Sequence, residues 1–402
     1  MIRRIFLPAL AASAYAAPAG YRIQLDTIRK GYDGKTCWVH PRAGAIPGKT
    51  PSIVLTMSPL DVSGSDIFEA IADMRTDDLG RKWTEPAQHR STLERRAEPG
   101  GVTSVICDFY PKWHAKTRKL LGVGHTARYR DGKVMAERRR ETAYSIYDPA
   151  ARAWSPWVTM AMPAGPKFEN AGAGSVQRVD AADGSILLPV YFKEPASKAY
   201  SVTVLRCRFD GRALAYETHG NELRLASERG FVEPSLARFD GRYFLSLRND
   251  SDGYAASSPD GLRFDEPRPL RFDDGSSLGN YNTQTHWVTH ANALFLVYTR
   301  KGANNDHVFR HRAPLFIAHF DPAKMAVIRR TERIAVPERG ARLGNFGVVN
   351  VNERETWITT AEWMQTWGPN FVMPRDNKYG SDNSVYAARL IWDTPNRGWD
   401  SY

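Results

Sequence analysis

The fold prediction rests on the stretch Glu228-Arg-Gly-Phe-Val-Glu-Pro-Ser-Leu-Ala-Arg-Phe-Asp-Gly-Arg-Tyr-Phe-Leu-Ser-Leu-Arg-Asn249. Asp240-Gly241 is a strong two-residue hairpin turn, because glycine tolerates the positive φ that such turns require, and the flanking runs are apolar and β-prone. Glu233 lies seven residues before Asp240, and Arg248 lies seven residues after Gly241. Two antiparallel strands paired about this turn would place the carboxylate and the guanidinium at the same end of the hairpin.

Similar units of a turn followed by a β-type run recur on both sides of this hairpin. They are Asp131-Gly-Lys-Val134, Asp183-Gly-Ser-Ile-Leu-Leu-Pro-Val-Tyr-Phe192 and Asn292-Ala-Leu-Phe-Leu-Val-Tyr-Thr299. No long amphipathic helical period is present, so the sequence predicts an all-β protein. A β-propeller protects its sheet edges by arranging the sheets in a ring, and it suits this length. A large β-sandwich and a parallel β-helix are the structural alternatives.

The N-terminus has the pattern of a secretion signal. Arg3 and Arg4 precede the apolar run 5–12, and Ala-Tyr-Ala ends at Ala16 or Ala17 as a small-residue cleavage site. We therefore expect residues 1–17 to be a signal peptide, residues 18–402 to form a single domain, and the mature protein to be secreted or periplasmic. No later segment has the roughly eighteen continuous apolar residues that would span a bilayer.

The composition limits the classes of partner. The formal net charge is +11 at pH 7, and the basic residues are dispersed instead of forming a run with interleaved aromatic residues. This pattern favours an acidic glycan over nucleic acid. The three cysteines, Cys37, Cys107 and Cys207, are too few for a disulfide scaffold or a structural zinc site. We expect a monomer with no metal and no cofactor.

Three short motifs connect the sequence to a known family. Thr76-Asp-Asp-Leu-Gly-Arg-Lys-Trp83 fills the Ser/Thr, Asp, Gly and Trp positions of an Asp-box, and Ser258-Pro-Asp-Gly-Leu-Arg-Phe264 is a shortened copy. Ser145-Ile-Tyr-Asp148, with Trp154 after it, is a degenerate copy without the glycine. In order and spacing these motifs resemble those of the sialidase (neuraminidase) superfamily over most of the mature chain, and the resemblance implies a six-bladed propeller.

The resemblance also assigns roles to residues of this chain. Arg42, in Arg42-Ala-Gly-Ala-Ile46-Pro47, together with Arg248 and Arg312, would clamp the carboxylate of the substrate, since planar guanidinium forks match carboxylate oxygens in pairs. Glu233 falls at the family's glutamate that polarises a nucleophilic tyrosine. Asp61 is the first candidate for the acid/base, and Asp66 is the second.

The sequence departs from the family at the nucleophile. The stretch Arg342-Leu-Gly-Asn345-Phe346-Gly-Val348 stands where the tyrosine is expected, and neither Asn345 nor Phe346 has an ionisable oxygen. Four phenols elsewhere are candidates to replace it: Tyr281, Tyr298, Tyr379 and Tyr386.

Two polar loops, residues 279–287 and 300–312, are rich in the side chains that read sugar hydroxyls. Within them we predict His286 as a catalytic residue and Gln284, His307 and His311 as substrate-binding residues, since histidine titrates near neutral pH. His125 follows a glycine turn, and we expect a structural role for it.

The sequence thus predicts an exported, sialidase-like exo-glycosidase that removes a terminal acidic sugar from glycans. A polysaccharide lyase that acts on uronate-containing glycans through His and Tyr is one alternative, because the usual nucleophile is missing. A non-catalytic glycan-binding propeller is the other.

Overall fold

The computed structural model describes residues 19–64, 66–227, 229–367 and 371–397. The predicted all-β class is confirmed, because the described residues contain strands and only three short 3-10 turns, η1 (Pro166–Phe168), η2 (Phe309–His311) and η3 (Arg329–Thr331). The predicted signal peptide, residues 1–17, lies outside the described residues. No helix in the described ranges is long and apolar enough to cross a membrane.

The strands form six sheets of at least four strands and one two-stranded ribbon. The first sheet contains β2 (Thr36–Ile46), β3 (Ser52–Asp61), β4 (Ile67–Phe68), β5 (Ala72–Thr76) and β6 (Ala87–Gln88). The second contains β7 (Arg96–Glu98), β8 (Val102–His114), β9 (Lys119–Arg130), β10 (Lys133–Val134), β11 (Thr142–Asp148), β12 (Ala153–Trp154) and β13 (Val158–Thr159). The third contains β14 (Ala171–Gly172), β15 (Val179–Asp180), β16 (Ser185–Phe192), β17 (Ser201–Phe209) and β18 (Leu214–His219).

The remaining sheets follow in chain order. The fourth contains β19 (Val232–Phe239), β20 (Arg242–Arg248), β21 (Gly253–Ser258) and β22 (Arg268–Pro269). The fifth contains β23 (His286–His290), β24 (Ala293–Tyr298), β25 (Leu315–Asp321), β26 (Ala326–Val327) and β27 (Arg333–Val336). The sixth contains β28 (Gly347–Asn352), β29 (Glu355–Ala361), β32 (Val385–Trp392) and β1 (Tyr21–Arg29), and the ribbon pairs β30 (Gln365–Trp367) with β31 (Phe371–Val372).

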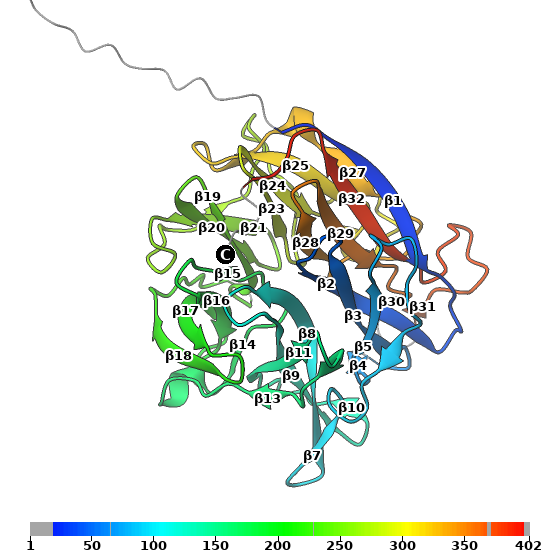
Figure 1. The fold of residues 1–402 in the computed structure, drawn as a ribbon, viewed down its shortest axis with the longest axis vertical. Helices are drawn as coiled ribbons and strands as arrows, with labels where there is room; N and C mark the ends of the chain where they lie inside the picture. The colour runs from blue at the N-terminus through cyan, green and yellow to red at the C-terminus, as the bar shows by residue number, and fades with distance from the viewer. Residues whose placement is uncertain (1–18, 65, 228, 368–370, 398–402) are drawn as a thin grey trace, which may run out of the picture.

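The sheets are arranged around a centre, and the chain passes from one to the next around the ring (Figure 1). This is a β-propeller arrangement. The ring closes where β1 pairs antiparallel with β32, from Tyr21 opposite Trp392 to Arg29 opposite Val385. The predicted hairpin is also present, since β19 pairs with β20 and Phe239 lies opposite Arg242 across the Asp240-Gly241 turn.

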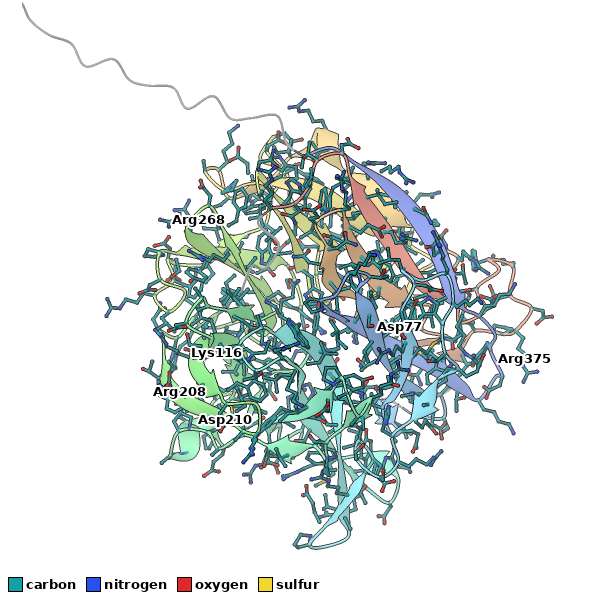
Figure 2. All side chains as sticks on the ribbon, in the orientation of Figure 1. Asp77, Lys116, Arg208, Asp210, Arg268 and Arg375 are labelled. Atoms are coloured by element: carbon teal, nitrogen blue, oxygen red, sulfur yellow. The ribbon has the colours of Figure 1, made fainter. Side chains whose placement is uncertain are left out.

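Apolar clusters fill the space between neighbouring sheets. Each of six clusters combines side chains from two adjacent sheets, and the last joins the sixth sheet back to the first. Phe295 of the fifth sheet and Ile358 of the sixth share one cluster, and Leu55 of the first sheet and Trp357 of the sixth share another. Charged side chains such as Arg208, Arg268 and Arg375 lie at the periphery (Figure 2).

Two predicted Asp-box segments form turns with the same hydrogen bonds. The amide of Gly80 donates to Thr76 Oγ1 at 2.9 Å, and the amide of Lys82 donates to Asp78 Oδ1 at 3.0 Å. In the second segment the amide of Gly261 donates to Ser258 Oγ at 2.9 Å, and the Asp260 carboxylate likewise accepts from amides of the turn. Neither turn borders the arginine-rich cavity described below.

The Asp78→Ala substitution should lower the melting temperature, because it removes the acceptor for the Lys82 amide and for the Thr76 hydroxyl. Ligand binding in the central cavity should not change. Thermal unfolding of this variant beside Lys82→Ala, which keeps the carboxylate, measures the effect. A fully stable Asp78→Ala protein that had lost ligand binding would contradict the assignment of this turn to stability.

Candidate functional site

A cavity of about 510 Å³ opens at one end of the ring, and its lining is rich in charged side chains. Nine arginines line it but only three carboxylates do, within the described part of the chain. The carboxylates are Asp66, Asp108 and Glu233. A second cavity of about 360 Å³ lies further along the same inner strands, and its buried Arg178 is satisfied by Asp180 and two backbone carbonyls. The arginine-rich cavity is therefore the candidate site.

One backbone feature recurs in all six sheets at this end of the ring. In or just before the innermost strand of each sheet, a residue other than glycine has a positive φ, between 47° and 67°. The six residues are His40, Asp108, Ser175, Glu233, Asn282 and Asn345. At His40, Asp108 and Glu233 the strand pairing also shifts register, which marks a β-bulge.

A left-handed conformation costs an L-residue roughly 1–2 kcal/mol, so six such residues at equivalent positions need a reason. Bulges re-aim side chains and are common beside active sites. Four of the six residues line the cavity. The other two support it: Ser175 donates to Asp108 at 2.6 Å, and Asn282 Oδ1 accepts from Arg248 at 2.8 Å.

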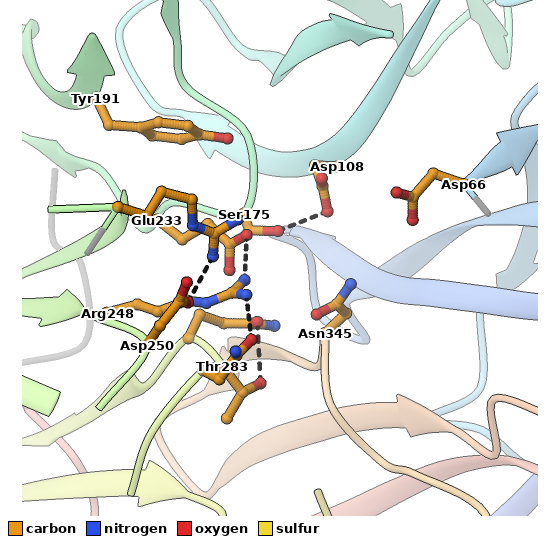
Figure 3. A network of polar contacts seen from close by, with 12 residues as sticks. Asp66, Asp108, Ser175, Tyr191, Glu233, Arg248, Asp250, Thr283 and Asn345 are labelled. Carbon is orange, nitrogen blue, oxygen red and sulfur yellow. Dashed lines mark hydrogen bonds and ion pairs between the residues drawn. The ribbon is translucent and has the colours of Figure 1, made fainter. Parts of the chain in front are cut away.

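The structure brings together the two residues at the ends of the hairpin. Arg248 Nη1 donates to Glu233 Oε1 at 2.5 Å, and both side chains are almost completely buried (Figure 3). Burial opposes ionisation of Glu233, yet the positive charge of Arg248 keeps the pKa of this carboxyl below its ordinary value. Because Arg248 already has two protein partners, Glu233 and Asn282, it has less capacity for a ligand than an unpaired arginine.

Three arginines of the cavity lining have no ion-pair partner among the described residues. They are Arg310, Arg312 and Arg342. Arg312 donates only to Asn282, and its buried Nε is unpaired. Burial, then the charges of Arg248, Arg342 and Arg310, hold the pKa of Arg312 well below its ordinary value. Burial also lowers the pKa of Arg342 to about 9. A bound anion would relieve this repulsion.

Asp108 is the centre of a second group of contacts. Its carboxylate lies 3.4 Å from His40 Nδ1, 3.6 Å from His125 Nε2 and 3.6 Å from Arg42 Nη2. Arg42 is fully buried and also donates to Ser175 Oγ at 2.7 Å and to the carbonyl of Phe346 at 3.2 Å. Arg42 therefore lies beneath the cavity and holds Asp108, whereas Arg248 and Arg312 line the cavity itself.

A phenol not considered in the sequence prediction lies in the cavity. The hydroxyl of Tyr191 is 3.1 Å from His125 Nδ1, and His125 in turn faces Asp108. Figure 3 shows Tyr191 on the same side of the cavity as Asp108 and Glu233. Burial raises the pKa of Tyr191 well above its ordinary value, and burial lowers the pKa of His125 to about 4. At neutral pH the pair is therefore a neutral phenol beside a neutral imidazole.

The two predicted acid/base candidates lie in different places. Asp61 ends β3, accepts a hydrogen bond from the Ser63 amide at 2.9 Å and does not line the cavity. Asp66 does line it, with φ +53° and an ion pair to Arg138 at 2.6 Å. Of the two, only Asp66 is placed to act on a ligand in the cavity.

Asn345 occupies the position where the family resemblance expects the tyrosine. It lines the cavity, and its Nδ2 lies 2.6 Å from His40 Nε2. Gln284 is fully buried behind it. In the amide orientation that satisfies its surroundings, Gln284 donates to Glu233 at 3.3 Å and accepts from the Asn345 amide at 2.9 Å. Gln284 thus supports the wall instead of facing the ligand space.

Three predicted histidines lie outside the cavity lining. His286 is buried, with Ser235 Oγ at 2.7 Å and the Phe346 carbonyl at 3.0 Å from its two ring nitrogens. His307 stacks on Tyr379 and contacts Glu338, and His311 contacts Tyr281 and Asp306. All three histidine rings are therefore held by contacts with other protein groups, and none of them borders the cavity. The four phenols proposed from sequence are also absent from the lining; they are Tyr281, Tyr298, Tyr379 and Tyr386.

Cys107, Asp108 and His125 place one potential metal-ligand atom each within 4.8 Å of one another. We assign no metal to this cluster, because Arg42 approaches the same carboxylate and the cavity already has an excess of arginines. The three cysteines are buried free thiols.

No known protein family and no curated protein matches the sequence. Solved structures do match the fold. A Dyadobacter fermentans protein of unknown function superimposes with a TM-score of 0.60 at 13% identity, over 92% of this chain and 99% of that one.

Trypanosoma rangeli sialidase in complex with sialic acid gives a TM-score of 0.60 at 13% identity, over 94% of this chain and 60% of that one. The fold is sialidase-like. A leech intramolecular trans-sialidase gives 0.59 at 10% identity, over 90% of this chain and 70% of that one. At these identities the likeness supports the sialidase-like fold and does not establish the activity.

Stability should fall as the pH drops from about 6.5 to about 4. Burial lowers the pKa of both His40 and His125 to about 4, so in this range the unfolded chain binds protons at these positions and the folded protein does not. The contribution is up to roughly 3 kcal/mol for each histidine, at about 1.4 kcal/mol per pKa unit. Urea unfolding across this range measures the free energy of unfolding.

The His40→Gln/His125→Gln protein should show a flatter dependence of that free energy on pH, and His307→Gln is the surface control. Equal slopes in the unmodified protein and both variants would contradict the assignment of the pH dependence to His40 and His125.

Proposed function

We propose that this protein is an enzyme that cleaves an acidic glycan and holds the carboxylate of one sugar against Arg312, Arg310 and Arg342. The proposal rests on one observation: these cavity-facing guanidiniums have no carboxylate partner among the described residues, and burial, together with repulsion from Arg248, lowers the pKa of Arg312 and Arg310. An anionic ligand would offset that repulsion, and forked, charge-assisted hydrogen bonds to a carboxylate are strong.

The excess of positive charge favours one class of reaction. Glycoside hydrolysis passes through a transition state with oxocarbenium character, in which the sugar ring gains positive charge. β-Elimination next to a carboxylate instead builds negative charge on that carboxylate as the α-proton leaves. Preorganised cations stabilise developing negative charge, so this site suits a lyase that acts on a uronate-containing glycan.

Tyr191 and His125 supply a route for the proton. With the carboxylate on the arginines, the phenol proton would move to His125 Nδ1; this transfer is uphill, and the charges of Arg140 and Asp108 reduce its cost by favouring the phenolate and the imidazolium. The Tyr191 phenolate would then take the C5 proton of the uronate. The C5–H electron pair forms the C4=C5 double bond, and the C4–O bond breaks. The departing oxygen takes a proton from the newly formed Tyr191 hydroxyl.

Hydrolysis of a terminal acidic sugar is the second candidate. The buried Glu233–Arg248 pair and the cavity-facing Asp66 favour it, because they provide a carboxylate beside an arginine and a second carboxyl group in the cavity. In that reaction Tyr191 would be the nucleophile, because position 345, where the family resemblance expects the nucleophilic tyrosine, is an asparagine.

Further proposals complete this assignment. We take the six sheets and the six clusters between them to be six blades of one domain, residues 18–402. Residues 1–17 direct export to the periplasm or the medium, and the mature protein is a monomer that does not bind nucleic acid.

Incubation with uronate polysaccharides and, separately, with sialyl-glycans tests the proposal. Elimination yields an unsaturated product that absorbs at about 230 nm, whereas hydrolysis releases free sialic acid. The Tyr191→Phe variant should lose at least about a hundredfold in turnover while still binding substrate, as expected when an acid/base group is removed. Tight binding without turnover in the unmodified protein would identify a binding module.

Arg312→Lys should weaken acidic-substrate recognition roughly ten- to hundredfold, because an ammonium group cannot replace a forked pair. Recognition of a neutral analogue should change little. Arg128→Lys is the matched control, since Arg128 also lines the cavity but already pairs with Glu141 at 2.7 Å and Glu98 at 3.3 Å. Equal losses on the acidic and neutral substrates would exclude Arg312 as a carboxylate ligand.

A further inference from the structure

The loop between β10 and β11 contributes three consecutive arginines, Arg138, Arg139 and Arg140, to the lining of the same cavity. Arg138 is neutralised by Asp66 at 2.6 Å. The other two have no carboxylate within ion-pair distance among the described residues. Arg139 is exposed and donates to the carbonyl of Glu169 at 3.0 Å.

The guanidinium of Arg140 is held in place by phenols instead of an acid. Its Nη1 donates to the hydroxyl of Tyr200 at 2.5 Å and to the Arg138 carbonyl at 3.2 Å. The guanidinium carbon lies 5.2 Å from the ring centre of Tyr200 and 5.5 Å from that of Tyr191. Its Nε is buried without a partner. These contacts fix a cation beside the proposed reactive phenol, and none of them is to a carboxylate.

These two arginines and the proposed carboxylate-binding group enter the cavity from different sheets. The strands β10 and β11 lie on the opposite side of the centre from β24 and β25 (Figure 1), and Arg310 and Arg312 belong to the segment that joins β24 to β25. Of the nine arginines in the lining, four have acidic partners; these are Arg128, Arg138, Arg229 and Arg248. A single ligand carboxylate on Arg310, Arg312 and Arg342 therefore leaves Arg139 and Arg140 without a carboxylate partner.

We propose that Arg139 and Arg140 form a second anion subsite, so that the substrate is a glycan with two anionic groups on neighbouring sugars. The inference rests on the proposed function, because it places the first anion on Arg312. The second anion is a carboxylate or a sulfate ester, both of which accept forked hydrogen bonds from guanidinium. Lys193, with its Nζ 5.6 Å from the Tyr200 ring centre, adds positive charge on this side.

Calorimetry with the Tyr191→Phe protein tests the subsite without turnover. The ligands are a disaccharide with one uronate and one neutral sugar, a di-uronate, and the mono-uronate with a sulfate ester on the neutral sugar. We expect either the di-uronate or the sulfated ligand to bind at least tenfold more tightly than the mono-uronate. The stronger of the two identifies the chemistry of the second anion.

Arg140→Gln and Arg139→Gln, each in the Tyr191→Phe background, should remove most of that tenfold gain and leave the affinity for the mono-uronate within about twofold. Arg312→Gln should weaken all three ligands. Arg139 is exposed, so its variant reports on the subsite even if Arg140→Gln fails to fold. Equal affinity for all three ligands, or a gain that persists in the Arg139 and Arg140 variants, would overturn the subsite. If the gain appears but the unmodified protein forms neither an unsaturated product nor free sialic acid, the subsite stands and the proposed reaction fails.

Discussion

The left-handed residue in the innermost part of each sheet is the constraint on which the site depends. The inner strands of a ring converge on its axis, so their side chains would otherwise point into the apolar layers between sheets. A positive φ at His40, Asp108, Glu233 and Asn345 turns a polar side chain toward the open end. Each such residue opposes folding, and the packed layers on both sides offset that cost.

Charge imbalance is the second organising feature of the cavity. Arginine side chains that are buried without acids destabilise one another, and a folded protein tolerates this arrangement where a ligand brings the missing charge. Arg42 illustrates the contrast, because it is fully buried but is bound to Ser175, Asp108 and a carbonyl. Arg312 has no such set of partners. The difference separates a structural arginine from one that is available to a substrate.

The sequence was informative where function depends on local patterns. The Asp240-Gly241 turn and its flanking apolar runs identified the hairpin that brings Glu233 to Arg248, because turn chemistry acts over a few residues. The role of Tyr191 was not predictable, since it lies in a fully buried strand and meets His125 only through the packing of two sheets. His286 shows the opposite case: its polar loop led to its prediction as a catalytic residue, whereas the fold buries its side chain between Ser235 and the Phe346 carbonyl.

The closure of the ring by β1 and β32 affects how the molecule must assemble. Tyr21 and Trp392 are partners although 371 positions of sequence separate them. Contacts between such distant segments carry a large loop-closure entropy and form slowly. Until the last strand is available, the sixth sheet lacks its two outer strands and the apolar face of the fifth sheet is only partly covered. The seam is therefore a late kinetic step, and a chain delivered from its N-terminus stays incomplete until its final strand arrives.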